Sequence, residues 1–190
     1  MKMWGITNTG LVRSENQDAY AVFEADAFHA AVVCDGMGGA AGGQIASTLA
    51  AETYAAELEK ILKPDMTTEQ LREASSYAVA MANLAVENRA SEDDELSNMG
   101  TTLVSAIAYE GGAVVTNVGD SRAYYYADGV LQPITIDHTL VNFLLFSGKI
   151  KEEELETHPM KHMLIRAVGV EKTVEADDFF LPYTDGMKIL

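Results

Sequence analysis

The chain has 190 residues, 48% of them apolar and 22% charged, which indicates one globular domain with a sizeable core and argues against disorder. Its 29 acidic and 13 basic side chains leave a formal net charge of −16, which repels phosphate backbones and argues against nucleic acid as a partner. A single cysteine, Cys34, rules out an internal disulfide, and no uncharged stretch is long enough for a membrane helix or a signal peptide, so we expect a cytoplasmic protein without a membrane partner.

The first half of the chain predicts two strands followed by two helices. Residues 19–23 and 30–34 are short apolar runs typical of strands, separated by a polar stretch around Asp26. Residues 44–62 are rich in alanine and apolar on more than one face, which predicts a helix covered on two sides. Thr67 and Gln70 fit a capping box, and the acidic run at residues 92–95 predicts a solvated loop. Between this capping box and the acidic run, apolar residues recur at helical spacing and predict a second helix with one apolar face. These residues are Leu71, Ala74, Ala78, Met81, Ala82 and Ala85.

The second half predicts consecutive antiparallel hairpins. Strands are expected at residues 102–109, 113–118, 123–126 and 130–131, with glycine-containing turns between them. Residues 139–146 and 151–156 predict short helices. Residues 179–181 predict a strand, Asp185 and Gly186 a turn, and residues 187–190 the beginning of another strand. Because strands and helices do not alternate regularly, we expect an α+β fold with helices packed outside antiparallel sheet.

Three aspartates stand where a predicted strand meets a glycine or a polar turn. Asp18 ends the segment RSENQD, Asp35 begins DGMGG, and Asp120 lies in GDSR. A carboxylate at a strand end is held rigidly yet reaches solvent, and hard divalent cations bind such oxygen ligands. The glycines after Asp35 would let the backbone approach an ion, which makes the Gly36 carbonyl a further candidate ligand. The alternative is that DGMGG is only a flexible turn, and spacing alone leaves both interpretations open.

Arg13, five residues before Asp18, is a candidate phosphate ligand. A guanidinium group can bind two phosphate oxygens beside a cation cluster. The alternative is an ordinary surface arginine. The four histidines, His29, His138, His158 and His162, show no spacing typical of a ligand pair, so we expect structural or surface positions for them.

Taken together, five ordered motifs resemble the metal-dependent protein phosphatases of type 2C, and most closely the compact bacterial serine/threonine members. The motifs are TNTGLVRSENQDAY, VVCDGMGG, MGTTLVSAIAY, TNVGDSRAYYYADGVLQPITIDHTLVN and MLIRAVG. The resemblance covers residues 1–190 as a single phosphatase domain. It implies a four-layer αββα sandwich of two antiparallel sheets flanked by helices. It also implies two Mn²⁺ or Mg²⁺ ions between the sheets, which activate a water for attack on phosphoserine or phosphothreonine.

The same resemblance assigns roles by matching motif. Asp35 would bridge both metals, Gly36 would offer its carbonyl, Asp18 would hold a water on a metal, and Arg13 would bind the substrate phosphate. Asp120 matches an aspartate that helps to bind a third, weaker metal. Residues 139–164, called the flap-like segment below, match a flap that is linked to substrate choice. The implied partners are phosphorylated proteins, the substrates of a serine/threonine kinase.

The sequence departs from the family pattern at two places. Many relatives have a histidine directly after DGMGG as a candidate general acid, where this chain has Ala40, so another group or a metal-held water would have to protonate the leaving alkoxide. The family also has metal aspartates in a Ser-Asp-Gly and an Asp-Asn motif. Asp185 resembles the first of these, but its apolar neighbours Met187, Ile189 and Leu190 follow it, whereas in the family the apolar strand precedes the motif.

We therefore expect the Ser-Asp-Gly motif to begin beyond Leu190. On this interpretation the chain is a C-terminally incomplete phosphatase domain that lacks the last strands and half of the metal centre. The enzymatic hypothesis is a metal-dependent protein serine/threonine phosphatase. The alternative is a catalytically impaired phosphoprotein-binding or regulatory pseudophosphatase, and a metal-binding protein without phosphate chemistry is the third hypothesis.

Overall fold

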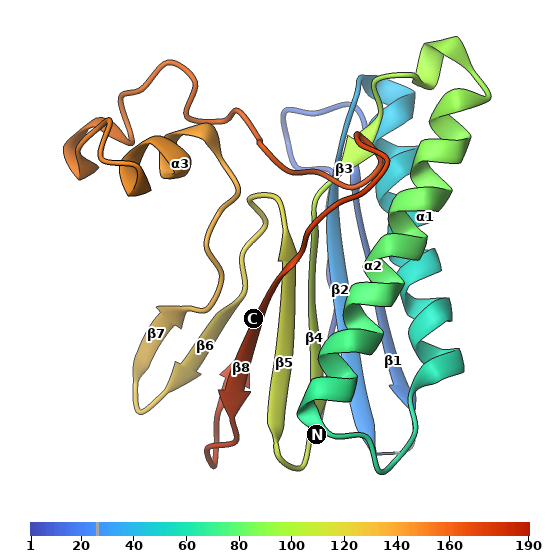
Figure 1. The fold of residues 1–190 in the computed structure, drawn as a ribbon, viewed down its shortest axis with the longest axis vertical. Coiled ribbons are helices and arrows are strands. Elements are labelled where there is room, and N and C mark those ends of the chain that lie inside the picture. Colours follow the sequence, from blue (N-terminus) through green and yellow to red (C-terminus); the bar gives the residue numbers. More distant parts are fainter. Residues whose placement is uncertain (26) are drawn as a thin grey trace.

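The computed structural model describes residues 1–25 and 27–190, so Asp26, and also the side chain of Ala40, lie outside the described residues. The strands form two antiparallel sheets, with helices packed against one of them (Figure 1). This arrangement confirms the α+β class with two antiparallel sheets, and it places the long helices against the larger sheet.

The larger sheet has the strand order β1-β2-β4-β5-β8, and the short strand β3 pairs with the end of β2. Its second strand shows why these residues form sheet: Phe28, Ala30, Val32 and Cys34 alternate with more exposed residues, so that one face of the strand is buried. The five strands predicted in this part are confirmed with small shifts at their ends. The bounds are β1 Asp18–Ala25, β2 Phe28–Met37, β3 Gly100–Thr101, β4 Leu103–Tyr109, β5 Gly112–Val118 and β8 Asp177–Pro182.

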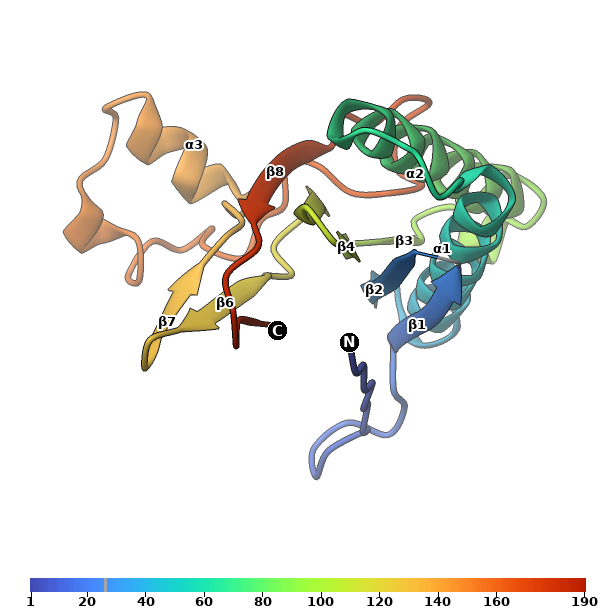
Figure 2. The same ribbon diagram turned by 90° about the horizontal axis from the view of Figure 1, so that it is seen from below.

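Two long helices, α1 (Ala40–Ile61) and α2 (Thr68–Ser91), cover one face of the larger sheet (Figure 2). The predicted capping box at Thr67 is confirmed, because its side chain accepts from the Gln70 amide and the Gln70 side chain accepts from the Thr67 amide. The predicted helix start at Gln44 is wrong by one turn. Gly42 and Gly43 interrupt the apolar pattern there, but both are buried within the first turn of α1. The two-sided cover expected for this helix is confirmed, because α1 packs against β1, β2 and α2.

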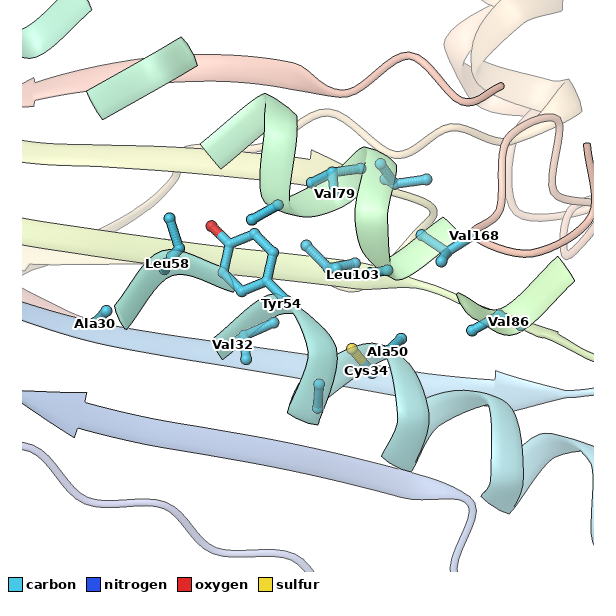
Figure 3. Close-up of a cluster of buried hydrophobic side chains, with 14 of the residues drawn as sticks. Ala30, Val32, Cys34, Ala50, Tyr54, Leu58, Val79, Val86, Leu103 and Val168 are labelled. Carbon is cyan, nitrogen blue, oxygen red and sulfur yellow. The ribbon is translucent and has the colours of Figure 1, made fainter. Parts of the chain in front are cut away.

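The main core lies between these helices and the sheet (Figure 3). Tyr54 and Leu58 of α1 pack there with Val79 of α2 and Leu103 of β4. Cys34 is completely buried in this core, and burial raises the pKa of its thiol, which keeps the thiol protonated and unreactive. On the opposite face of the sheet, a smaller cluster centred on Val104, Val115 and Ala123 joins the two sheets.

The smaller sheet consists of β6 (Tyr124–Ala127), β7 (Val130–Pro133) and β9 (Lys188–Ile189), in the order β7-β6-β9. The turn predicted at Asp185 and Gly186 leads into β9, and the Met187 amide donates to the Thr184 carbonyl at 3.1 Å. None of the helices in the described part of the chain is both long and apolar enough to cross a bilayer.

The flap-like segment begins with α3 (Leu140–Phe146), as predicted, and an isolated bridge joins Thr139 to Leu164 at its two ends. The helix predicted at residues 151–156 is wrong in extent, because only Glu152–Glu154 form a single 3-10 turn. A second 3-10 turn, Asp94–Leu96, overlaps the loop predicted at residues 92–95.

Candidate active site

Asp18 and Asp35 are opposed across the β1–β2 pair, where they are cross-strand partners. Opposed residues of an antiparallel pair have Cβ atoms about 4.5–5.5 Å apart on the same face of the sheet. Both aspartates are exposed, and Asp35 points away from the helices because its neighbour Cys34 is buried against them. Two carboxylates in this position repel each other, and a divalent cation between them would relieve that repulsion.

The charges of Arg13 and Asp120 act on this pair of aspartates through their effect on Asp35. The pKa of Asp35 is raised, first because surrounding groups remove part of the carboxyl hydration, and then because Asp18 and Asp120 repel its negative charge. The positive charge of Arg13 acts in the opposite direction and lowers that pKa. Arg13, Asp18 and Asp120 therefore each lie within electrostatic reach of Asp35.

Thr102, between β3 and β4, holds the backbone at Asp35. The Asp35 amide donates to the Thr102 Oγ1 atom at 2.9 Å, and the Thr102 amide donates to the Asp35 carbonyl at 3.0 Å. The same Oγ1 atom lies 2.6 Å from the hydroxyl oxygen of Ser121, the residue after Asp120. One threonine thus connects the backbone of Asp35 to the loop that carries Asp120, a role that the sequence does not reveal because the pattern around Thr102 indicates only a strand.

Close packing, and not only backbone flexibility, requires a glycine at position 36. A Cβ atom at this position would lie 1.8 Å from the carbonyl oxygen of Gly43 in the first turn of α1. The Gly36 amide donates to the Gln17 carbonyl at 3.0 Å, which ties the end of β2 to the residue before Asp18. The interpretation of DGMGG as a merely flexible turn is therefore wrong at Gly36, because the backbone there is packed against α1.

The oxygen donors at this end of β2 fit a hard divalent cation. The opposed carboxylates of Asp18 and Asp35, together with the raised pKa of Asp35, are the observations that support this fit. Asp120 does not complete a tight cluster. Over residues 1–25 and 27–190, no three His, Cys, Asp or Glu side chains are grouped closely enough to hold a metal ion. The cross-strand register thus pairs Asp18 with Asp35, and Asp120 acts on Asp35 through its charge without completing a close group of three carboxylates among the described residues.

Asp185 lies far from these residues. Strand β8 pairs with β5 from Asp177, opposite Asn117, to Pro182, opposite Gly112. Asp185 follows Pro182, whereas Asp120 follows the other end of β5. The two aspartates are therefore separated by about the length of β5, which is on the order of 20 Å for a strand of this size.

A second polar cluster lies beside the loop of Asp120. His138 is buried, and its ring nitrogens contact the Gly119 amide at 3.1 Å and the Asp177 carboxylate at 3.2 Å. Arg166 donates to the same carboxylate at 2.6 Å. The sequence predicts a structural or surface position for His138 and contains no signal for this cluster, because its members come from three separate segments of the chain.

Residues 12–188 match the family described as protein phosphatase 2C. A serine/threonine phosphatase of Listeria innocua is 37% identical to this chain, over 93% of this chain and 70% of its own length. The serine/threonine protein phosphatase PstP of Mycobacterium tuberculosis is 34% identical, over 95% of this chain and 35% of its own length.

Solved structures show the same similarity. The crystal structure of the serine/threonine phosphatase Stp1 from Staphylococcus aureus superposes with a TM-score of 0.84 at 33% identity, over 93% of this chain and 69% of that chain. The structure of the Mycobacterium tuberculosis serine/threonine phosphatase PstP gives a TM-score of 0.80 at 31% identity, over 95% and 72% of the two chains.

Proposed function

The chain belongs to the protein phosphatase 2C family of metal-dependent enzymes, and on that premise we propose that it is a bacterial, cytoplasmic protein serine/threonine phosphatase. Its substrates are proteins that a serine/threonine kinase has phosphorylated on serine or threonine. The observation that carries the proposal is the opposition of Asp18 and Asp35 at the end of β2, within electrostatic reach of Arg13.

Asp35, Asp18 and the Gly36 carbonyl would together hold the paired cations, and Asp120 would serve a third, weaker cation. Bound Mn²⁺ or Mg²⁺ lowers the pKa of water and neutralises charge on the phosphoryl group. The chain contributes rigidity to this arrangement, since Thr102 and Gln17 hold the backbone at Asp35 and Gly36 through hydrogen bonds.

Arg13 lies in the irregular segment before β1, and its side chain is exposed to an incoming substrate. Its guanidinium would bind two oxygens of the phosphate and orient the phosphorus toward the attacking water. In the reaction, the water oxygen forms a bond to phosphorus while the bond from phosphorus to the serine or threonine oxygen breaks. The attacking water gives up one proton and the departing alkoxide takes one up, so the products are inorganic phosphate and a free hydroxyl, and no residue of the enzyme becomes phosphorylated.

Hydrolysis of a phosphothreonine peptide across a Mn²⁺ titration tests this proposal. We expect turnover that depends on the metal in the wild-type chain and is lost in Asp35→Asn. Asp65→Asn, an exposed carboxylate in the turn between α1 and α2, is the matched control and should keep full activity. Equal turnover in the wild type and Asp35→Asn would show that the proposed centre is not the catalytic one.

A phosphoprotein-binding or regulatory module without turnover is the second candidate function. It is favoured by the lack, across the described residues, of any cluster of three side chains suited to a metal. Such a module would bind a phosphothreonine peptide, measured by fluorescence anisotropy, without releasing phosphate. Arg13→Ala would weaken that binding, which separates this outcome from a chain that neither binds nor hydrolyses the peptide.

A further inference from the structure

His138 stands directly before the flap-like segment and forms two hydrogen bonds with the residue before Asp120. The Gly119 amide donates to the ring Nδ1 atom of His138 at 3.1 Å. In return, the His138 amide donates to the Gly119 carbonyl at 2.9 Å. Gly119 has a φ of +102°, and a Cβ there would lie 2.6 Å from the Thr102 side chain, so the backbone of this loop has little freedom to adopt another path.

The hydrogen bond from Gly119 determines which ring nitrogen of His138 carries the proton. A nitrogen that accepts a hydrogen bond is unprotonated, so the neutral ring carries its hydrogen on Nε2. That atom lies 3.2 Å from Asp177 Oδ2, to which it donates. Arg166 NH1 lies 3.3 Å from the same Nε2 atom but 2.6 Å from Asp177 Oδ1, and as a donor it bonds to the carboxylate. Burial lowers the pKa of His138, which supports the neutral ring.

Both ends of the flap-like segment meet at His138. The next residue, Thr139, is the N-cap of α3 and forms the bridge to Leu164. The Ile165 amide donates to the His138 carbonyl at 2.9 Å. Next to His138 in sequence, Asp137 accepts two hydrogen bonds from Arg122, at 2.8 and 2.6 Å, which joins the same short stretch to the far side of the Asp120 loop.

We propose that His138 is a positioning residue that couples the flap-like segment to the loop carrying Asp120, with Asp177 holding its ring in the Nε2–H tautomer. A displacement of the segment when substrate binds is passed through His138 to Gly119 and so to the backbone of Asp120. The consequence for metal dependence rests on the proposed function, whereas the tautomer and the coupling do not.

Two substitutions test the hydrogen bonds of the two ring nitrogens of His138 separately. In His138→Asn, the side-chain oxygen takes the place of Nδ1 and can still accept from Gly119, but the contact with Asp177 is lost. In His138→Gln, the terminal amide takes the place of Nε2 and can still donate to Asp177, but Gly119 loses its acceptor. Both variants remove the buried ring, so a role limited to packing would affect them equally, and thermal unfolding shows whether both fold.

The first measurement is made on the wild-type chain, in which ¹⁵N NMR of the His138 ring should show protonated Nε2 and unprotonated Nδ1. Hydrogen exchange of the Gly119 amide should rise roughly fivefold in His138→Gln, the effect of one lost hydrogen bond, and stay near the wild-type rate in His138→Asn. The Mn²⁺ concentration for half-maximal peptide hydrolysis should rise roughly tenfold in the Gln variant and little in the Asn variant.

Protonated Nδ1 in the wild type, or equal Gly119 exchange in the two variants, would overturn the proposal. If the wild-type chain hydrolyses no peptide, the proposed function fails, and the tautomer and the exchange rates still decide whether His138 positions the Asp120 loop. If the chain is active and exchange differs as expected but the Mn²⁺ requirement is the same in both variants, the coupling to the metal position is wrong.

Discussion

Replacement of Asp18 by asparagine should stabilise the metal-free chain and should also remove its response to Mn²⁺. Asp18 and Asp35 are cross-strand partners, and like charges in that position are destabilising. At a separation of about 5 Å in a medium like water, two unit charges repel by about 0.8 kcal/mol. Because both side chains are exposed, solvent screens the pair further, and we expect a gain of about 0.5 kcal/mol in the free energy of unfolding.

In the presence of Mn²⁺, Asp18→Asn should instead be less stable than the wild type. A ligand present at a hundredfold excess over its dissociation constant stabilises the folded chain by about 2.7 kcal/mol, and Asp18→Asn removes one of the two opposed carboxylates that would bind it. Urea unfolding in EDTA and in saturating Mn²⁺ measures both effects. The control Asp65→Asn should change neither value by more than about 0.5 kcal/mol. An Asp18→Asn chain that is less stable than the wild type in EDTA would refute the repulsion, and one stabilised by Mn²⁺ as much as the wild type would refute the shared cation.

Three further predictions concern the scaffold around the site. Gly36→Ala should reduce the free energy of unfolding in urea by about 3 kcal/mol, because the added Cβ would lie 1.8 Å from the Gly43 carbonyl oxygen. In the control Gly42→Ala the added Cβ would come no closer than 3.1 Å to Met99, so the free energy of unfolding should change by less than about 1 kcal/mol. An equal loss of stability in the two variants would contradict close packing at Gly36. Tyr54→Phe removes a buried hydroxyl that lies 2.7 Å from Ser75 Oγ and 2.6 Å from Ser105 Oγ, and should cost about 1–3 kcal/mol in the same assay without changing the Mn²⁺ dependence of hydrolysis. The third prediction concerns pH. Burial lowers the pKa of His138 in the folded chain, where its ring faces Asp177, Arg166 and Asp137. The neutral ring therefore contributes fully to stability above the ordinary histidine pKa of about 6.5, and this contribution is lost as the pH falls toward the lower pKa of the folded chain. Melting temperatures between pH 7.5 and 5.5 should therefore fall more steeply in the wild type than in His138→Asn, and equal slopes would contradict the lowered pKa.

The proposed role of His138 also gives the flap-like segment a physical connection to the site. The segment is joined at its base to Gly119 by His138 and to Arg122 by Asp137, on the two sides of Asp120. Under this proposal, a substrate that moved the segment would act on the Asp120 backbone without contacting it. This route differs from the Thr102 connection, which links Asp35 to Ser121 through the larger sheet.

Local sequence patterns determined most of the elements. Period-two alternation placed β2, helical spacing and a capping box placed α2, and glycine turns separated the hairpins, because each of these signals depends on residues close together in the chain. The same local signals were misleading where tertiary packing intervenes. Helix α1 begins at Ala40 although Gly42 and Gly43 weaken its first turn, because these glycines are buried there, with Gly43 against the backbone of Gly36.

The sequence by itself also identified the charged residues of the candidate site, since Arg13, Asp18, Asp35 and Asp120 stand in motifs that resemble a known family. Only the tertiary structure decided how they are arranged. Asp18 and Asp35 are opposed because the β1–β2 hairpin has one register, and a slip by one residue would turn one of the two side chains to the opposite face of the sheet. Asp177 meets His138 and Arg166 because β8 pairs with β5, and Arg166 meets His138 because the Ile165 amide donates to the His138 carbonyl. Such contacts join segments far apart in the chain, so their geometry depends on the register of the sheet and cannot be inferred from local spacing.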